Sequence, residues 1–305
     1  AGDSVLTIMP IFHGFGIGVC VHTELISGMN VILVPLFKPK DFAKLIKKNK
    51  PAFLAGVPTM YEALINSKEK SKTYLKGLVN VICGGDVLNE TLRNNVDAYL
   101  KSHGSTANIR VGYGLTECTG ASCLTPRYYF KEGGIGIPLP DTIYTIVDPN
   151  IEDRLVPLKF ENDKDFLEGE LAVSSPAVTS GKLDEKIIVP HYELDGKSYI
   201  RTRDLVKMSR DGIFTFESRK DRSFTRFDGY KIKPYEIEKV IEENAMIKYC
   251  RVVPYYDNKQ RGLMPIAHLV LNEEIELNEE EKVSLINEIV YRQIIANPNM
   301  SSRQI

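Results

Sequence analysis

The sequence lacks an excess of charge of either sign. Its 39 basic and 40 acidic residues leave a net charge of -1, so neither a nucleic-acid surface nor an acidic tail is expected. It also lacks a cysteine framework, because its five cysteines are an odd number and are widely scattered. That pattern argues against structural disulfides and for a reducing compartment, so we expect a cytoplasmic protein.

A long uninterrupted hydrophobic run is missing too. The best candidate, residues 15–37, contains His22, Glu24 and Asn30, so no membrane span is expected. The chain begins with alanine, and the absence of a signal peptide is therefore not inferred. With 305 residues, 43% of them hydrophobic and 26% charged, the composition is typical of a soluble globular protein with room for two domains.

What the first part of the chain does contain is an alternation of short apolar runs with helical patterns. The runs that predict strands are 31–36, 52–58, 78–85 and 109–114. We expect 31–36, "VILVPL", to be a buried strand, and Asn89 to begin a helix that stops at Gly104. Repeated units of this kind predict a parallel sheet with helices covering its faces.

The pattern changes near residue 133 and again near residue 218. Short strands joined by turns predict a β-rich subdomain over 133–217. An amphipathic helix, two strands and a long final helix follow, which predict a small α+β domain at 218–305. The predicted fold class is therefore α/β, with a partial large domain at 1–217 (α/β over 1–132, then β-rich) and a small C-terminal domain.

Two glycine-marked loops follow predicted strands, at Gly84-Gly85-Asp86 and at 112–117. Ligands bind at the carboxyl ends of strands in an open parallel sheet. Glycine lets backbone N–H groups approach a ligand, and Tyr113 offers a flat stacking face. Thr116 can donate to a phosphate, and Glu117 can hold Mg²⁺. The pattern favours a nucleoside triphosphate, and a tight turn with an exposed polar tip is the alternative.

Further segments extend this interpretation. The set is "MPIFHGFG" (9–16), "GVPTMY" (56–61), "CGGDVL" (83–88), "VGYGLTE" (111–117), "GIGIPLP" (134–140), "GELAVSSPAVTSGK" (169–182), "YIRTRDL" (199–205) and "ESRKDRSFTRFDGYKIKPYEIE" (217–238). Together these segments resemble the superfamily of AMP-forming adenylating enzymes, which includes acyl-CoA synthetases, firefly luciferase and the adenylation domains of nonribosomal peptide synthetases. A single motif of this kind is weak, whereas eight in the family's order over most of the chain are specific.

The resemblance implies a nucleotide site built from several segments. The residues that it places around the adenine and the phosphates are Gly84, Gly85, Asp86, Tyr113, Gly114, Thr116 and Glu117. Tyr113 would stack on the ring, Thr116 would touch the α-phosphate and Glu117 would coordinate Mg²⁺. Asp204 and Arg219 would hold the ribose hydroxyls, since a carboxylate accepts and an arginine donates hydrogen bonds to a sugar.

The resemblance also implies residues for the chemistry itself. His13 would lie near the carboxylate that is activated, and Lys231 would reach the phosphates from the small domain. Gly229 and Tyr230 would line a thiol channel after that domain has turned about a hinge near Asp221.

Plainer alternatives stand beside these roles. His13 can be a packing residue, Asp204 can open a hairpin, and Arg219 can be a solvated linker charge. Cys118 and Cys123 flank the glycine loop, but with no histidine nearby they make a poor zinc site. We predict that these two cysteines are small buried apolar residues.

The sequence departs from the family pattern at several positions. Arg203 replaces the glycine of the Thr-Gly-Asp segment, so the backbone there must tolerate a side chain. Ser218 stands where a glycine usually precedes the hinge arginine, and the run from Asp221 to Gly229 is one residue longer than usual. The family's phosphate loop and its C-terminal catalytic lysine have no match, and we expect them outside these 305 residues. Because such donors supply much of the catalysis, we expect this piece alone to be a weak catalyst.

The function implied by the resemblance is ATP-dependent activation of a carboxylic acid to an acyl-adenylate, followed by transfer to a thiol. ATP and Mg²⁺ are the implied cofactors, coenzyme A the implied thiol and fatty-acid metabolism one implied setting. One alternative is an adenylation domain that loads the phosphopantetheine of a carrier protein. Others are a non-catalytic nucleotide-binding relative and a plain α/β scaffold.

Overall fold

The computed structural model describes residues 2–127, 131, 133–179, 182–184, 187–272, 275 and 277–289, without the side chains of 182–184, 187, 188, 221 and 231. The chain divides into two compact units. The first is Ala1–Thr202 with Val206–Phe216, and the second is Arg203–Leu205 with Glu217–Ile305. This division lies beside the boundary predicted at 217/218, and the assignment of named domains to the two sides stays a prediction.

The first unit begins with parallel strands. They are β1 (Ser4–Thr7), β2 (Asn30–Leu33), β3 (Phe53–Gly56), β4 (Asn80–Cys83) and β5 (Ile109–Tyr113), in the order β2-β1-β3-β4-β5. Each neighbouring pair among them is parallel. The parallel sheet predicted from alternating strand and helix patterns is confirmed.

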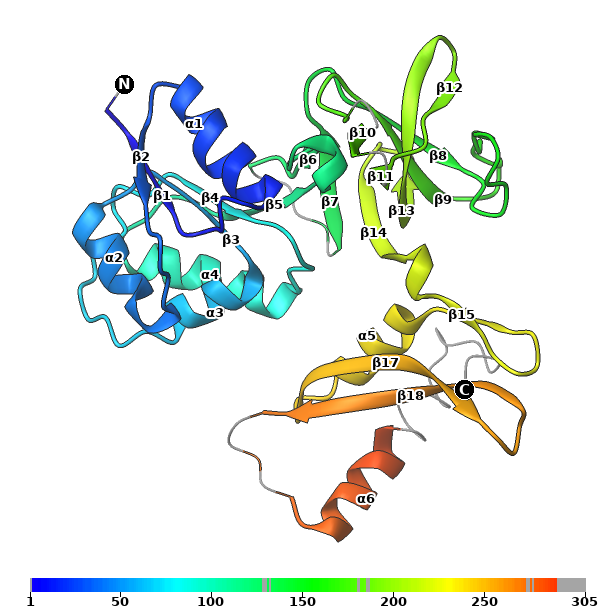
Figure 1. Cartoon of the computed structure of the whole chain (residues 1–305). Helices are drawn as coiled ribbons and strands as arrows, with labels where there is room; N and C mark the ends of the chain where they lie inside the picture. Colours follow the sequence, from blue (N-terminus) through cyan, green and yellow to red (C-terminus); the bar gives the residue numbers. More distant parts are fainter. Residues whose placement is uncertain are drawn as a thin grey trace. The chain divides into compact units, whose positions relative to one another are not determined.

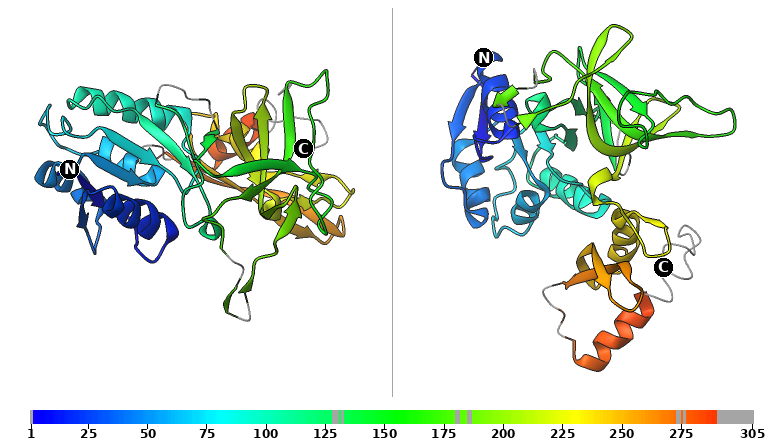
Figure 2. Two further views of the ribbon diagram at one scale, coloured as in Figure 1. Left: turned by 90° about the horizontal axis from the view of Figure 1, so that it is seen from above. Right: turned by 45° about the vertical axis from the view of Figure 1, so that its right-hand side comes forward.

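Helices cover both faces of this sheet. On one face lie α2 (Phe42–Asn49), α3 (Pro58–Ile65) and α4 (Glu90–Ser102), and on the other lie the π-helix η1 (Phe15–His22) and α1 (Thr23–Ile26) (Figures 1 and 2). A short 3-10 helix, η2 (Pro39–Asp41), precedes α2. The predicted start of α4 is confirmed, because the side chain of Asn89 accepts a hydrogen bond from the Leu92 N–H at 2.8 Å.

Strand β2 is a half-exposed edge strand, so the prediction of a buried strand at 31–36 was wrong. It stands at the end of the strand order, and Leu33 is 52% exposed. The strand also stops at Leu33, two residues before Pro35. An apolar run favours a strand but does not say which place that strand takes in the sheet.

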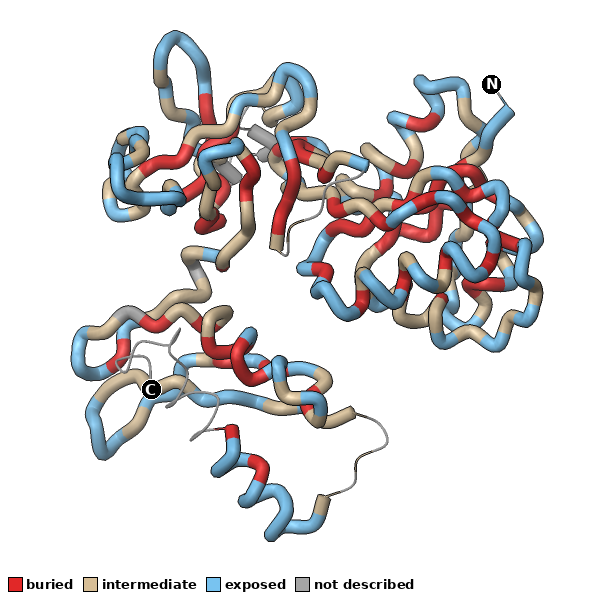
Figure 3. The backbone as a smooth tube through the Cα atoms, turned by 180° about the vertical axis from the view of Figure 1, so that it is seen from behind, coloured by how far each residue is buried: buried red, intermediate tan, exposed pale blue. Residues whose placement is uncertain are grey.

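The chain from Cys123 to Arg219 forms mainly strands, and the prediction of a β-rich stretch at 133–217 is confirmed. The strands are β6 (Cys123–Leu124), β7 (Gly134–Pro138), β8 (Ile143–Val147), β9 (Phe166–Ser174), β10 (Lys182–Asp184), β11 (Ile187–Ile188), β12 (Tyr192–Leu194), β13 (Lys197–Ser209) and β14 (Phe214–Arg219). The path β6-β7-β14-β13-β9-β8 continues from β5 and, with β12, completes a 12-stranded sheet. Leu171, Ala172 and Val173 of β9 are among the buried residues of this region, and Figure 3 colours buried positions of the chain red.

The second unit is α+β. It contains η4 (Lys220–Arg222), β15 (Phe224–Thr225), β16 (Lys231–Ile232), α5 (Pro234–Glu242), β17 (Ile247–Asp257), β18 (Gly262–Leu271) and α6 (Glu279–Glu288). Strands β17 and β18 form an antiparallel hairpin, and apolar side chains of α5, β17 and α6 share one core. Asn278 and Glu281 form a capping box at the start of α6. The predicted final helix begins as expected, and its residues beyond Ile289 lie outside the described part of the chain.

Within the described residues, no helix combines the length and the apolar character needed to cross a membrane.

Candidate functional site

The loop after β5 doubles back on itself through glycine. Strand β5 ends at Tyr113, and a 3-10 turn, η3 (Thr116–Cys118), follows Gly114. A Cβ atom on Gly114 would lie only 1.5 Å from the backbone oxygen of Gly120, so no side chain fits there. The glycine that the sequence places beside Tyr113 is therefore required for the loop to close.

Tyr113 is half-buried at the end of β5. Its ring meets the ring of Tyr144 edge-on, with centroids 6.5 Å apart and planes at 87°. The Tyr144 hydroxyl forms a 2.6 Å hydrogen bond with Ser122, and burial raises the pKa of Tyr144 far above its usual range. This neighbour limits the orientation of the Tyr113 ring, which suits Tyr113 to stacking.

The turn η3 contains two polar residues, Thr116 and Glu117, followed by the buried Cys118. Thr116 is exposed, Glu117 is half-buried and Cys118 is buried. Burial, together with the charge of the neighbouring Glu117, raises the pKa of Cys118 to about 12. Cys118 is thus a neutral packing residue, as predicted, and the same holds for the buried Cys123, whose pKa burial also raises to about 12.

The second glycine loop, after β4, lies beside the first. A Cβ atom on Gly84 would lie 2.9 Å from the Gly112 oxygen and 3.5 Å from the ring of Phe15 in η1. Gly85 has a left-handed φ of 80°. Asp86 is exposed, and its carboxylate accepts the Val87 N–H at 2.8 Å. The backbone of this loop is therefore packed against both η1 and β5.

His13 stands at the start of the same neighbourhood. The residue is exposed, and its Nδ1 accepts the Phe15 N–H at 3.1 Å, which leaves the ring hydrogen on Nε2 in the neutral form. A Cβ atom on the adjacent Gly14 would lie 3.4 Å from the Gly120 nitrogen, so His13 is near the loop that carries Thr116 and Glu117. An exposed side chain does not fit the alternative of a buried packing histidine.

In the second unit, Asp204 and Arg219 are paired. Arg219 Nε lies 2.8 Å from Asp204 Oδ1, the carboxylate being 6% exposed and the arginine side chain 54% exposed. Asp204 lies inside β13, which is a neighbour of β14 in the sheet. The structure thus brings together the two residues that the resemblance assigns to a ribose.

The comparisons with known proteins agree with these motifs. The model of the family described as "AMP-binding enzyme" matches residues 1–182. The chain belongs to this AMP-binding enzyme family. Its fold is shared with a solved structure, o-succinylbenzoate CoA synthetase from Bacillus subtilis: the TM-score is 0.73 at 21% identity, over 99% of this chain and 56% of that structure.

Curated relatives are similar along most of the chain. A 4-coumarate–CoA ligase-like protein 3 of Arabidopsis thaliana is 28% identical over 92% of this chain and 49% of its own length. A long-chain-fatty-acid–CoA ligase of Bacillus subtilis is 27% identical over 92% of this chain and 47% of its own length. The chain therefore spans about half the length of the relatives it matches.

The segment in which the hinge was predicted contains a short antiparallel strand pair, β15 and β16. The residues between β15 and β16 form a loop, 226–230, in which Arg226 and Asp228 pair at 2.8 Å and Gly229 has a φ of 85°. The Tyr230 oxygen accepts the Arg226 N–H at 2.7 Å. The backbone of Lys231 continues into β16, whereas its side chain and that of Asp221 lie outside the described part of the structure.

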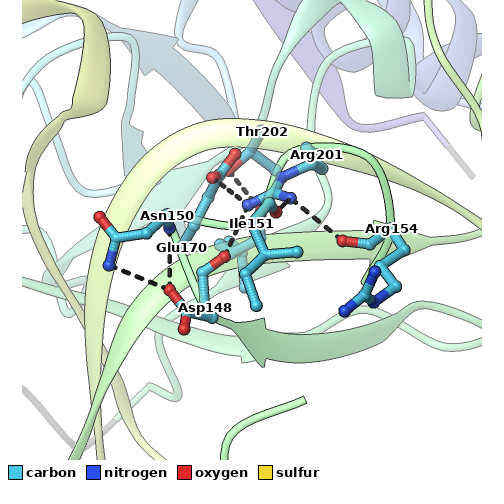
Figure 4. A network of polar contacts seen from close by, with 8 residues as sticks. Asp148, Asn150, Ile151, Arg154, Glu170, Arg201 and Thr202 are labelled. Atoms are coloured by element: carbon cyan, nitrogen blue, oxygen red, sulfur yellow. Dashed lines mark hydrogen bonds and ion pairs between the residues drawn. The ribbon is translucent and has the colours of Figure 1, made fainter. Parts of the chain in front are cut away.

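A buried ion pair near β13 was not predicted from the sequence. Arg201 Nη2 lies 2.7 Å from Glu170 Oε2, and the two side chains are 5% and 0% exposed. The same guanidinium donates to the backbone oxygens of Asp148 (2.9 Å), Ile151 and Arg154 (3.4 Å) (Figure 4). In the sequence, each of these two residues is visible only as a charge inside an apolar strand pattern. The two lie 31 positions apart, so the pairing cannot be read from local spacing.

Proposed function

We propose that this chain is part of an enzyme that uses ATP to activate a carboxylic acid. A substrate carboxylate oxygen would attack the α-phosphorus, pyrophosphate would leave, and an acyl-adenylate would form. In a second step a thiol, for which coenzyme A is our choice, would attack the acyl carbon and displace AMP. The observation that carries the proposal is the convergence of His13, the Gly84 loop and the Tyr113–Glu117 loop at the carboxyl ends of β4 and β5.

The residues proposed for the nucleotide suit its parts. Tyr113 is fixed on one side and half-buried, which suits an adenine ring. Thr116 is exposed at the tip of η3 and can donate to a phosphate oxygen. Asp204 and Arg219 offer an acceptor and donors for ribose hydroxyls, since the Arg219 side chain is reached by solvent.

Glu117 fits a magnesium ion that arrives with the nucleotide. The described residues contain no group of three or more side chains that could hold a metal by themselves. Mg²⁺ is commonly held by one or two carboxylates together with phosphate oxygens and waters, and Glu117 supplies such a carboxylate. The ion would offset negative charge on the phosphates, while Thr116, Gly114 and the neighbouring backbone position them.

A non-catalytic nucleotide-binding relative is the second candidate. Arg203 favours it, because this residue has a φ of 65° where the family pattern has glycine. A carrier-protein thiol in place of coenzyme A remains an alternative for the second step, and full-length sequence with a downstream carrier domain would favour it.

The proposal is tested by calorimetric titration of this chain with Mg·ATP. Tyr113→Ala is expected to weaken binding by about 1–3 kcal/mol, the usual contribution of an aromatic ring stacked on a base. Tyr249→Ala, which changes an exposed tyrosine of β17, is the matched control and should bind like the wild type. Absent binding, or equal losses in both variants, would refute the nucleotide site. Pyrophosphate exchange with a panel of carboxylic acids in the full-length protein then separates the enzyme from the non-catalytic relative.

A further inference from the structure

The turn that carries Glu117 meets η1 and its N-cap residue Gly14 backbone against backbone. A Cβ atom on Gly18 of η1 would lie 2.3 Å from the Thr119 oxygen. A Cβ atom on Gly120 would lie 2.8 Å from the Gly14 oxygen. Because real Cβ atoms essentially never come this close to backbone, a side chain at either position would push the two segments apart. The turn and η1 are thus packed at the shortest distance that two backbones allow.

The opposite side of the turn is held by the segment after β9. The Thr119 hydroxyl donates to the Ala177 oxygen at 3.0 Å, and the Thr179 N–H donates to the Glu117 oxygen at 2.8 Å. Residues 116–119 therefore lie between two fixed pieces of the first unit, η1 and residues 177–179.

Thr119 itself has an unfavourable backbone conformation. Its φ is 60°, in the left-handed region that a β-branched residue rarely adopts. Such a conformation persists only where the surroundings impose it, and it is found most often at functional sites. Here the contact with Gly18 and the hydrogen bond to Ala177 are the surroundings that impose it.

We propose that Gly18 and Thr119 are positioning residues for the Glu117 carboxylate. This inference rests on the proposed function, because it assigns them to the placing of a magnesium ligand. A carboxylate that binds a metal is oriented by the groups behind it, and their loss weakens the metal rather than the rest of the ligand. Neither Gly18 nor Thr119 needs to touch the nucleotide for this effect.

The test measures how much Mg²⁺ tightens ATP binding, as the ratio of the Kd for ATP in EDTA to the Kd for Mg·ATP. Gly18→Ala, which introduces the 2.3 Å contact, is expected to lower this ratio about tenfold, the low end for losing a group that orients a metal ligand. Gly77→Ala is the control, because the nearest atom to its Cβ would be the Lys50 oxygen at 3.8 Å. Its ratio should equal that of the wild type.

A second pair of variants keeps the test valid if Gly18→Ala does not fold. Thr119→Val keeps the shape but loses the hydroxyl that bonds Ala177, and should lower the ratio. Thr119→Ser keeps the hydroxyl and should preserve it. A purely structural role would instead reduce the thermal midpoint and both affinities together.

The outcomes separate the two claims. If the wild type binds ATP and the ratio is unchanged in both Gly18→Ala and Thr119→Val, the inference fails and the proposed nucleotide site stands. If the wild type binds no nucleotide with or without Mg²⁺, the proposed function fails and the inference falls with it.

Discussion

Strand β13 contributes one residue to each of two arginine–carboxylate pairs, Arg201–Glu170 and Arg219–Asp204. The two pairs differ in how much of their side chains is exposed. Arg201 and Glu170 are both buried, and three backbone oxygens take further hydrogen bonds from the guanidinium. Asp204 is equally buried, but the side chain of its partner Arg219 is 54% exposed. The first pair ties the chain to itself, whereas the second leaves donors within reach of a solute. Ion pairs with similar distances, 2.7 and 2.8 Å, can therefore have separate roles.

The largest expected effect comes from breaking the buried pair. Arg201→Met leaves the Glu170 carboxylate buried without its cation, which should lower the free energy of unfolding by about 3–5 kcal/mol. Urea denaturation measures this change. The double variant Arg201→Met with Glu170→Met should recover much of the loss, because no isolated charge remains. A loss below about 1 kcal/mol would show that the pair is not structural.

The Asp204–Arg219 pair, in which only the arginine is exposed, should affect binding more than stability. Asp204→Asn is expected to weaken ATP binding by about 1.5–3 kcal/mol, the contribution of a hydrogen bond to a charged group. Titration with 2′,3′-dideoxy-ATP supplies the control, since a nucleotide without ribose hydroxyls should bind wild type and variant alike. Unchanged ATP affinity in Asp204→Asn would move the ribose contact elsewhere.

Arg203 lies in β13 between Arg201 and Asp204, and changing it is expected to alter stability by a smaller amount. The φ of Arg203 is 65°, a conformation that costs a residue with a Cβ atom about 1–2 kcal/mol. Glycine avoids this cost, but it loses more conformational entropy on folding, which offsets part of the gain. We expect Arg203→Gly to be more stable than Arg203→Ala by about 1 kcal/mol in thermal or urea unfolding. Equal stability of the two variants would show that the left-handed conformation at this position costs alanine no more free energy than it costs glycine.

A third arginine pair, Arg226–Asp228, should show the smallest effect, because its carboxylate is 39% exposed and solvent screens the interaction. The hydrogen bond from Arg226 lowers the pKa of Asp228 from 3.8 to about 2. Because the folded-state pKa is the lower one, the stabilisation is present above pH 4 and is lost as the pH falls toward 2. Acid unfolding curves of wild type and Asp228→Asn should therefore differ above pH 4 and converge near pH 2. A constant difference across this range would contradict the assignment.

Local patterns in the sequence predicted the elements that short-range chemistry determines. Asn89 begins α4 because its side chain accepts an N–H of the first turn, and the alternation of strand and helix predicts parallel pairing. The place of β2 at the sheet edge depends on which strands lie beside it, and its own residues do not encode that.

Features that depend on distant partners were not predictable in the same way. Helix η1 contains Gly16 and Gly18, which are poor helix formers, and the backbone of Pro10 and Thr119 lies too close to those glycines for any side chain there. Glu170 and Arg201 meet only after β9 and β13 have paired in one sheet. The glycine loop at Tyr113, by contrast, was visible in the sequence, because the residue types and their spacing are local.

The measurement that tests the central claim most directly is photolabelling of this chain with 8-azido-ATP, followed by peptide mapping. A label that unlabelled ATP competes away is predicted on the peptides that contain Gly84–Val87 or Val111–Glu117, since these loops would border the adenine. A competed label confined to other peptides, or no competed label at all, would contradict the nucleotide site proposed at the ends of β4 and β5.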